Sequence, residues 1–177
     1  YFNRKYPDFP VFQTNITRKN MAEMVQAAFD YYAGRKTQQA AGMLKSFGIL
    51  DGDKIRPEGS KYASYYIDMI KKLPPQGVIN YSDIMEPDGI DWQRDKRFKI
   101  WYLFTPIIFL SLVYGGYAVI TMKDGKTLTA ANLDQIPKIS VYNLYEFKYL
   151  SRPAEISMAE LKKLFEIVGI NPVLLDN

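Results

Sequence analysis

The sequence predicts an α+β protein that is mostly helical, with an N-terminal helical lobe, then a winged-helix-like lobe with a β-hairpin wing, and a C-terminal helix. Three observations predict this fold. Several segments carry apolar residues at helical spacing behind a capping residue. An Asp-Gly turn separates two β-forming runs. Hydrophobic residues make up 47% of the 177 residues, enough for a sizeable core. We expect lobes at 1–60 and 61–135 and an extension at 136–177.

The N-terminal lobe is expected to hold two helices and a short strand. The first helix should cover 18–32 behind Thr17 as its N-cap, and the second should cover 37–47 and end at Gly48. Asp51-Gly52-Asp53 has the start of a calcium loop, but Ile55 and Arg56 stand where an oxygen ligand and a glycine are needed. A plain turn is therefore expected there.

The order of elements in 61–135 is that of a winged helix. A helix over 61–73 should begin after Ser60, followed by a strand at 78–80 and a short helix at 81–85 capped by Ser82. Helical turns at 96–104 and a helix at 106–114 come next. The last elements are the strands 117–122 and 127–130, joined by a turn at Asp124-Gly125.

The uncharged run 100–120 is long enough to span a bilayer, so a membrane helix is the competing interpretation. Thr105 is a good N-cap, Pro106 suits a first helical position, and Gly115-Gly116 suits a helix end. A helix bounded in this way has about nine residues and a length of about 14 Å. We therefore expect a buried core helix, with Leu110 in the core, followed by a strand.

The amino-acid composition argues against catalysis. The sequence has no Cys and no His, which excludes thiolate nucleophiles, histidine bases and most transition-metal sites. Asp88 and Asp91, near Glu86, have no partner base and no phosphate-binding glycines beside them, so a solvated acidic loop is expected. No phosphate-binding loop motif occurs. We expect no enzyme activity, no cofactor, no metal and no nucleotide site in this chain.

The net charge is +4, and no lobe is strongly basic. Residues 1–60 hold nine Lys/Arg against six Asp/Glu, 61–135 hold nine against eight, and 136–177 hold five against five.

The candidate nucleic-acid-binding residues combine a basic cluster with two lysines of the wing: Arg94, Lys96, Arg97, Lys99, Lys123 and Lys126. The alternative is a solvated basic face. The helix at 106–114 has almost no side chain that could read a base edge, so non-specific DNA binding or a protein partner is expected.

The tail is expected to hold one helix, from Ser157 to Val168. Ser157 and Glu160 have the spacing of a capping box, and Leu161, Leu164 and Val168 share one face.

Several segments of the chain resemble part of a known protein family. They include PDFPVFQTNIT, MLKSFGILDGDKIRPEGSKYA and GVINYSDIM in the first half, and LSLVYGGYAVITMKDGKTLTAANLDQI, Arg152-Pro153 and AELKKLFEIVGINPVLL in the second. They are similar to a region of the large bacterial and archaeal P-loop ATPases of phage growth limitation and BREX defence systems. The resemblance implies a region beyond the ATPase core, where a winged helix often follows a helical lid.

The sequence therefore favours a non-catalytic accessory region of a phage-defence ATPase, located in the cytoplasm and outside the membrane. Its partners would be DNA, bound weakly and without specificity, or a protein, along with the remainder of the ATPase chain. The alternative is a structural or oligomerisation module that couples ATPase subunits without binding nucleic acid.

Overall fold

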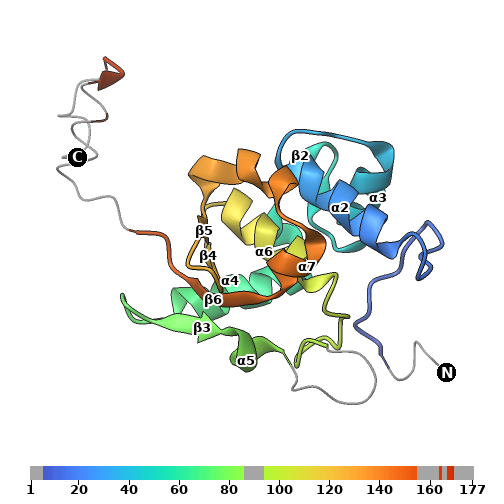
Figure 1. The fold of residues 1–177 in the computed structure, drawn as a ribbon, viewed down its shortest axis with the longest axis horizontal. Helices are drawn as coiled ribbons and strands as arrows, with labels where there is room; N and C mark the ends of the chain where they lie inside the picture. The colour runs from blue at the N-terminus through green and yellow to red at the C-terminus, as the bar shows by residue number, and fades with distance from the viewer. Residues whose placement is uncertain (1–5, 86–93, 155–163, 165–166, 170–177) are drawn as a thin grey trace.

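The computed structural model describes residues 6–85, 94–154, 164 and 167–169 and has a mixed α+β fold, as predicted (Figure 1). Its helices are α2 (Met21–Tyr32), α3 (Gln38–Ser46), α4 (Lys61–Lys71), α5 (Tyr81–Ile84), α6 (Thr105–Tyr114) and α7 (Val141–Tyr145), with the 3-10 segments η1 (Pro57–Gly59) and η2 (Ala130–Lys138). Its strands are β1 (Leu50–Asp51), β2 (Lys54–Ile55), β3 (Val78–Asn80), β4 (Val119–Met122), β5 (Thr127–Leu128) and β6 (Phe147–Ser151).

The N-terminal helices form where the sequence places them, but one cap differs. Thr37, expected as the first residue of its helix, is the N-cap of α3 and accepts a hydrogen bond from Ala40 N at 3.2 Å. The N-cap of α2 is Asn20, not Thr17, and α2 begins three residues later than expected. The Asn20 side chain accepts a hydrogen bond from Thr17 N at 2.7 Å, which closes a turn before the helix. The turn expected at 51–53 joins the antiparallel pair β1–β2.

The order expected for a winged helix is confirmed by α4, β3, α5, α6 and the β4–β5 hairpin. Ser60 caps α4 by accepting from Ala63 N, and its hydroxyl donates to Phe47 O at 2.6 Å. The cap of α5 is Asn80 rather than Ser82, because Asp83 completes a capping box with Asn80.

The sheet is larger than a two-stranded wing, because a strand from the C-terminal extension joins it. β6 lies between β3 and β4, and the strand order is β3-β6-β4-β5 with every pair antiparallel. Ile79, Leu150, Ile120 and Leu128 align across the four strands and are all buried. This row is the core side of the sheet.

Helix α6 lies at the centre of the molecule (Figure 1) and contacts α2, α4, α7, β4 and both 3-10 segments. Every residue from Thr105 to Val113 is buried, including the predicted core residue Leu110. A helix that is apolar on all sides must be enclosed by protein or lipid. Here protein encloses it, and none of the described helices is long and apolar enough to cross a bilayer.

Three expectations need correction or lie outside the described residues. Residues 96–104 form turns and isolated bridges, Met85 to Asp95 and Arg94 to Trp101, instead of helical turns. Thr105 is the first residue of α6 and not its cap; the N-cap is Phe104. The predicted helix over 157–168 and the acidic residues Glu86, Asp88 and Asp91 fall largely or wholly in residues that the structure does not describe.

Candidate functional site

The basic cluster before α6 is built around a buried carboxylate. The Asp95 side chain is 1% exposed and accepts hydrogen bonds from Phe98 N at 2.7 Å, Ile100 N at 2.6 Å and Arg97 N at 3.1 Å. Tyr66 donates a fourth at 3.3 Å. Burial raises the pKa of Asp95, and these hydrogen bonds oppose the rise. Asp95 therefore orders the loop 95–100 and is not a surface acid that weakens the field of the cluster.

Arg94, Arg97 and Lys96 contact groups within the fold. The Arg94 guanidinium lies over the Tyr6 ring, 4.3 Å from its centroid. Arg97 lies 5.8 Å from the Tyr65 ring and 5.1 Å from the Phe98 ring. Lys96 donates to Ser82 O at 2.6 Å.

The fourth cation, Lys99, is half-buried and has a left-handed backbone with φ of 58°. These contacts tie the loop to the protein, and the side chains of Lys96 and Arg97 remain exposed to solvent.

The wing lysines lie on the exposed turn of the hairpin, and each is paired with an acid. Lys123 Nζ lies 3.2 Å from Glu146 Oε2, and Lys126 Nζ lies 2.8 Å from Asp124 Oδ2. The hydrogen bond from Lys126 lowers the pKa of Asp124, and the same contact raises the pKa of Lys126, so both are charged at neutral pH.

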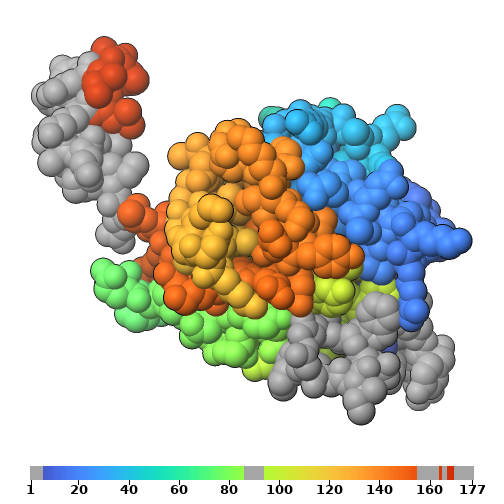
Figure 2. Space-filling model, in the orientation of Figure 1, coloured from blue at the N-terminus to red at the C-terminus, as the bar shows by residue number. Residues whose placement is uncertain are grey.

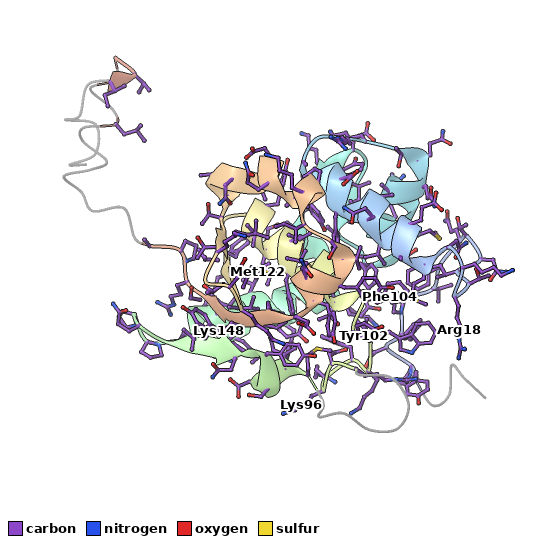
Figure 3. All side chains as sticks on the ribbon, in the orientation of Figure 1. Arg18, Lys96, Tyr102, Phe104, Met122 and Lys148 are labelled. Carbon is purple, nitrogen blue, oxygen red and sulfur yellow. The ribbon has the colours of Figure 1, made fainter. Side chains whose placement is uncertain are left out.

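The six candidate residues do not form one surface. Figure 3 shows Lys96 at the lower edge of the molecule, whereas Met122, next to Lys123, lies higher on the sheet. The basic cluster and the wing are thus two separate places. A ligand that contacts the wing lysines need not contact Arg94, Lys96, Arg97 or Lys99.

A concave site lies beside the wing. A pocket of about 620 Å³ opens between the β4–β5 turn, η2 and the segment that includes α7. This volume is in the range of small-ligand and side-chain pockets. Its floor is apolar, with Met122 and Leu128 buried and Ile139 half-buried. Figure 2 shows the amber hairpin on the surface, bordered by the orange segments that follow it.

The polar lining of the pocket includes residues that the sequence analysis did not select. Lys138 joins Lys123 and Lys126 as a third cation, and amide groups come from Gln135, Asn132 and Asn143. Asn132 has a structural role, because its Nδ2 donates to Thr127 O at 2.9 Å and its Oδ1 accepts from Thr129 N at 2.7 Å. Ser140 caps α7, and a serine at this place is a local sequence signal for the start of a helix.

Helix α6 occupies the place of the recognition helix that a winged helix inserts into a DNA groove, but it is buried in the core of this protein. α6 follows the short helix α5, as such an element would, but only Tyr114 at its end is exposed. Side chains that read base edges must reach the groove floor. This helix has none at its surface.

These features define an α+β domain whose elements follow the order of a winged helix. Its central helix is enclosed by the rest of the domain, and the hairpin is part of a four-stranded sheet. Residues 21–152 match a family described as "Family of unknown function (DUF6079) 4th domain". The match covers most of the chain, so the protein belongs to this family. Neither the curated proteins nor the solved structures contain a significant match.

Proposed function

We propose that the chain is a non-catalytic accessory domain of a larger phage-defence ATPase, and that it docks a protein partner at its wing. The family description, a fourth domain, supports a place within a larger protein. The resemblance of the quoted segments supports an ATPase as that protein. The absence of His and Cys from the sequence supports a non-catalytic role, and we propose a cytoplasmic location for the domain together with the ATPase.

The burial of α6 is the observation that favours protein docking over DNA binding. With Thr105–Val113 enclosed, α6 cannot enter a groove, so a duplex would be held by exposed surface cations such as those of the wing. A pocket with an apolar floor at the same place offers more to a protein side chain than to a phosphate backbone.

Weak, non-specific duplex binding is the second candidate function. Lys123 and Lys126 favour it, since their side chains are 63% and 84% exposed on a projecting hairpin. Their paired acids, Glu146 and Asp124, would have to be displaced or tolerated by the phosphates.

Site-specific cross-linking in the full-length protein distinguishes the candidates. A photoreactive residue in place of Thr127, on the exposed side of β5, should cross-link reproducibly to one protein; the same residue at Gln39, on exposed α3, serves as the control. Cross-links from Thr127 to DNA would favour the second candidate. Cross-links to another copy of the chain would favour an oligomerisation module, and no product at Thr127 beyond that at Gln39 would overturn the proposal.

A further inference from the structure

Three cations reach the wing pocket from different segments. Lys123 follows the end of β4, Lys126 ends the turn, and Lys138 is the last residue of η2. Because η2 folds back beside the hairpin, Lys138 borders the same concavity as Lys126, twelve residues before it, and Lys123, fifteen residues before it. The inference below deepens the proposed docking function and rests on it.

The three lysines of the pocket differ in the groups that they contact. Lys123 and Lys126 are held by ion pairs in which every side chain is at least half exposed. Exposed ion pairs of this kind contribute little to stability, so an incoming carboxylate can replace either acid at little cost. Lys138 contacts a neutral group, donating from Nζ to Gln135 Oε1 at 3.1 Å. Among the described residues, no acid lies within ion-pair distance of Lys138.

The floor of the pocket accepts an apolar group next to these cations. Met122 is 7% exposed and Leu128 is 2% exposed, so their side chains are already desolvated, and Ile139 packs against the same core. An apolar side chain that covers this floor loses water without stranding a polar group. The amides of Gln135 and Asn143 at the rim can bond to the backbone of a bound segment.

We propose that this pocket binds an acidic segment of a protein partner in which a carboxylate stands next to a large apolar side chain. The apolar side chain covers Met122, Leu128 and Ile139, and the carboxylate bonds to Lys138. Asp124 and Glu146 at the rim repel a chain that carries a charge at every position, which disfavours nucleic acid here. One carboxylate beside an apolar group avoids most of that repulsion.

The test uses amide chemical shifts of the ¹⁵N-labelled 177-residue chain and three synthetic peptides. The probe is Gly-Ser-Asp-Leu-Gln-Gly-Ser. The first control, Gly-Ser-Asn-Leu-Gln-Gly-Ser, removes the side-chain charge, and the second, Gly-Ser-Asp-Gly-Gln-Gly-Ser, removes the apolar side chain. We expect saturable shifts at Lys126, Thr127, Gln135 and Asn143 with the probe, and at least fivefold weaker binding of each control. Equal binding of the probe and the uncharged peptide would overturn the inference and leave docking itself intact.

Variants locate the charge contact. Lys138→Gln should weaken binding of the probe about tenfold, the effect of one lost charge-assisted hydrogen bond. Lys45→Gln, on exposed α3, should leave it unchanged. Unchanged binding by Lys138→Gln, or no saturable shift with the probe, would overturn the inference. A random 20-base-pair duplex that shifts the pocket amides where the probe does not would overturn both the inference and the proposed docking function.

Discussion

The Tyr32 hydroxyl donates a hydrogen bond to the carbonyl oxygen of Ile107 at 2.8 Å, in a fully buried site. This contact joins α2 of the N-terminal segment to α6, 75 residues later in the chain. Burial raises the pKa of Tyr32 well above its usual value, so the phenol stays neutral and keeps its donor. The N-terminal helices and the winged-helix-like segment therefore share one core.

Tyr32→Phe should reduce stability, because it removes the donor and leaves the ring. A buried neutral hydrogen bond contributes about 0.5–1.5 kcal/mol net, and we expect a loss of that size in the free energy of unfolding measured in urea. Tyr142→Phe, at a side chain that is 55% exposed, is the control and should change stability by less than about 0.5 kcal/mol. Equal effects of the two substitutions would contradict the importance of this contact.

Leu110→Ala tests the central position of α6. Leu110 is fully buried, so the substitution should leave a cavity and cost about 2–5 kcal/mol in the free energy of unfolding. Gln39→Ala, on an exposed face of α3, is the matched control for a helical truncation to alanine. A cost below about 1 kcal/mol for Leu110→Ala would mean that the core around α6 is looser than the structure shows.

Asp95→Asn should lower the free energy of unfolding by more than the small change in side-chain shape suggests. Asp95 Oδ2 accepts from Ile100 N at 2.6 Å; an amide nitrogen there would place a donor against a donor, and the other rotamer would face Phe98 N instead. Leaving a buried backbone N–H without an acceptor costs about 1–3 kcal/mol. The measurement is the free energy of unfolding of Asp95→Asn in a chemical denaturant. The comparison variant is Asp83→Asn, at the exposed cap of α5. A neutral result for Asp95→Asn would show that the loop is not held by this carboxylate.

The local part of this fold could be predicted from the sequence, and the non-local part could not. Ser60 caps α4, and Asp124-Gly125 closes a hairpin, because those signals act within a few residues. We did not predict β6 from the sequence, because its partners β3 and β4 lie far from it in the chain. The alternation of Phe147 and Tyr149 with Lys148 was its only local signal.

The same limit applies to the candidate site. Counting charges finds Lys123 and Lys126, but it cannot show that Asp95 is buried, since burial depends on Tyr66 and on the loop that surrounds it. Lys138 was missed because it is a single lysine in sequence. It reaches the wing only after η2 has folded against the hairpin.

Alkaline pH should destabilise the protein in part through Tyr62. Burial, together with the carboxylates of Asp8 and Asp95, raises the pKa of Tyr62 to about 12. Because the folded pKa lies above the unfolded value of 10.0, the contribution of Tyr62 to stability is complete below pH 10 and is lost as the pH rises to about 12.

The measurement is the urea midpoint between pH 9 and 12. Tyr62→Phe removes both the ionisation and the hydrogen bond to Asp8 O at 2.7 Å. Its stability should start lower than that of the wild type and fall less steeply above pH 10. Parallel curves for Tyr62→Phe and the wild type would contradict the raised pKa.

Duplex binding, if the wing provides it, should depend only weakly on salt. The wing pocket offers three lysines, and the other candidate cations lie elsewhere and are engaged with Tyr6, Tyr65 and Ser82. Three phosphate contacts give a slope of log affinity against log salt no steeper than about −2.7. Anisotropy titrations of a labelled random duplex at several salt concentrations measure this slope.

The double substitution Lys123→Ala and Lys126→Ala should abolish whatever duplex binding exists at low salt. The double substitution Lys96→Ala and Lys99→Ala is its control, equal in charge and located in the loop before α6. Specificity should be absent, because the buried α6 leaves no side chain to read a base edge. A slope steeper than about −4, or binding lost in the control and kept in the wing variant, would move the interface to the basic cluster that Asp95 orders.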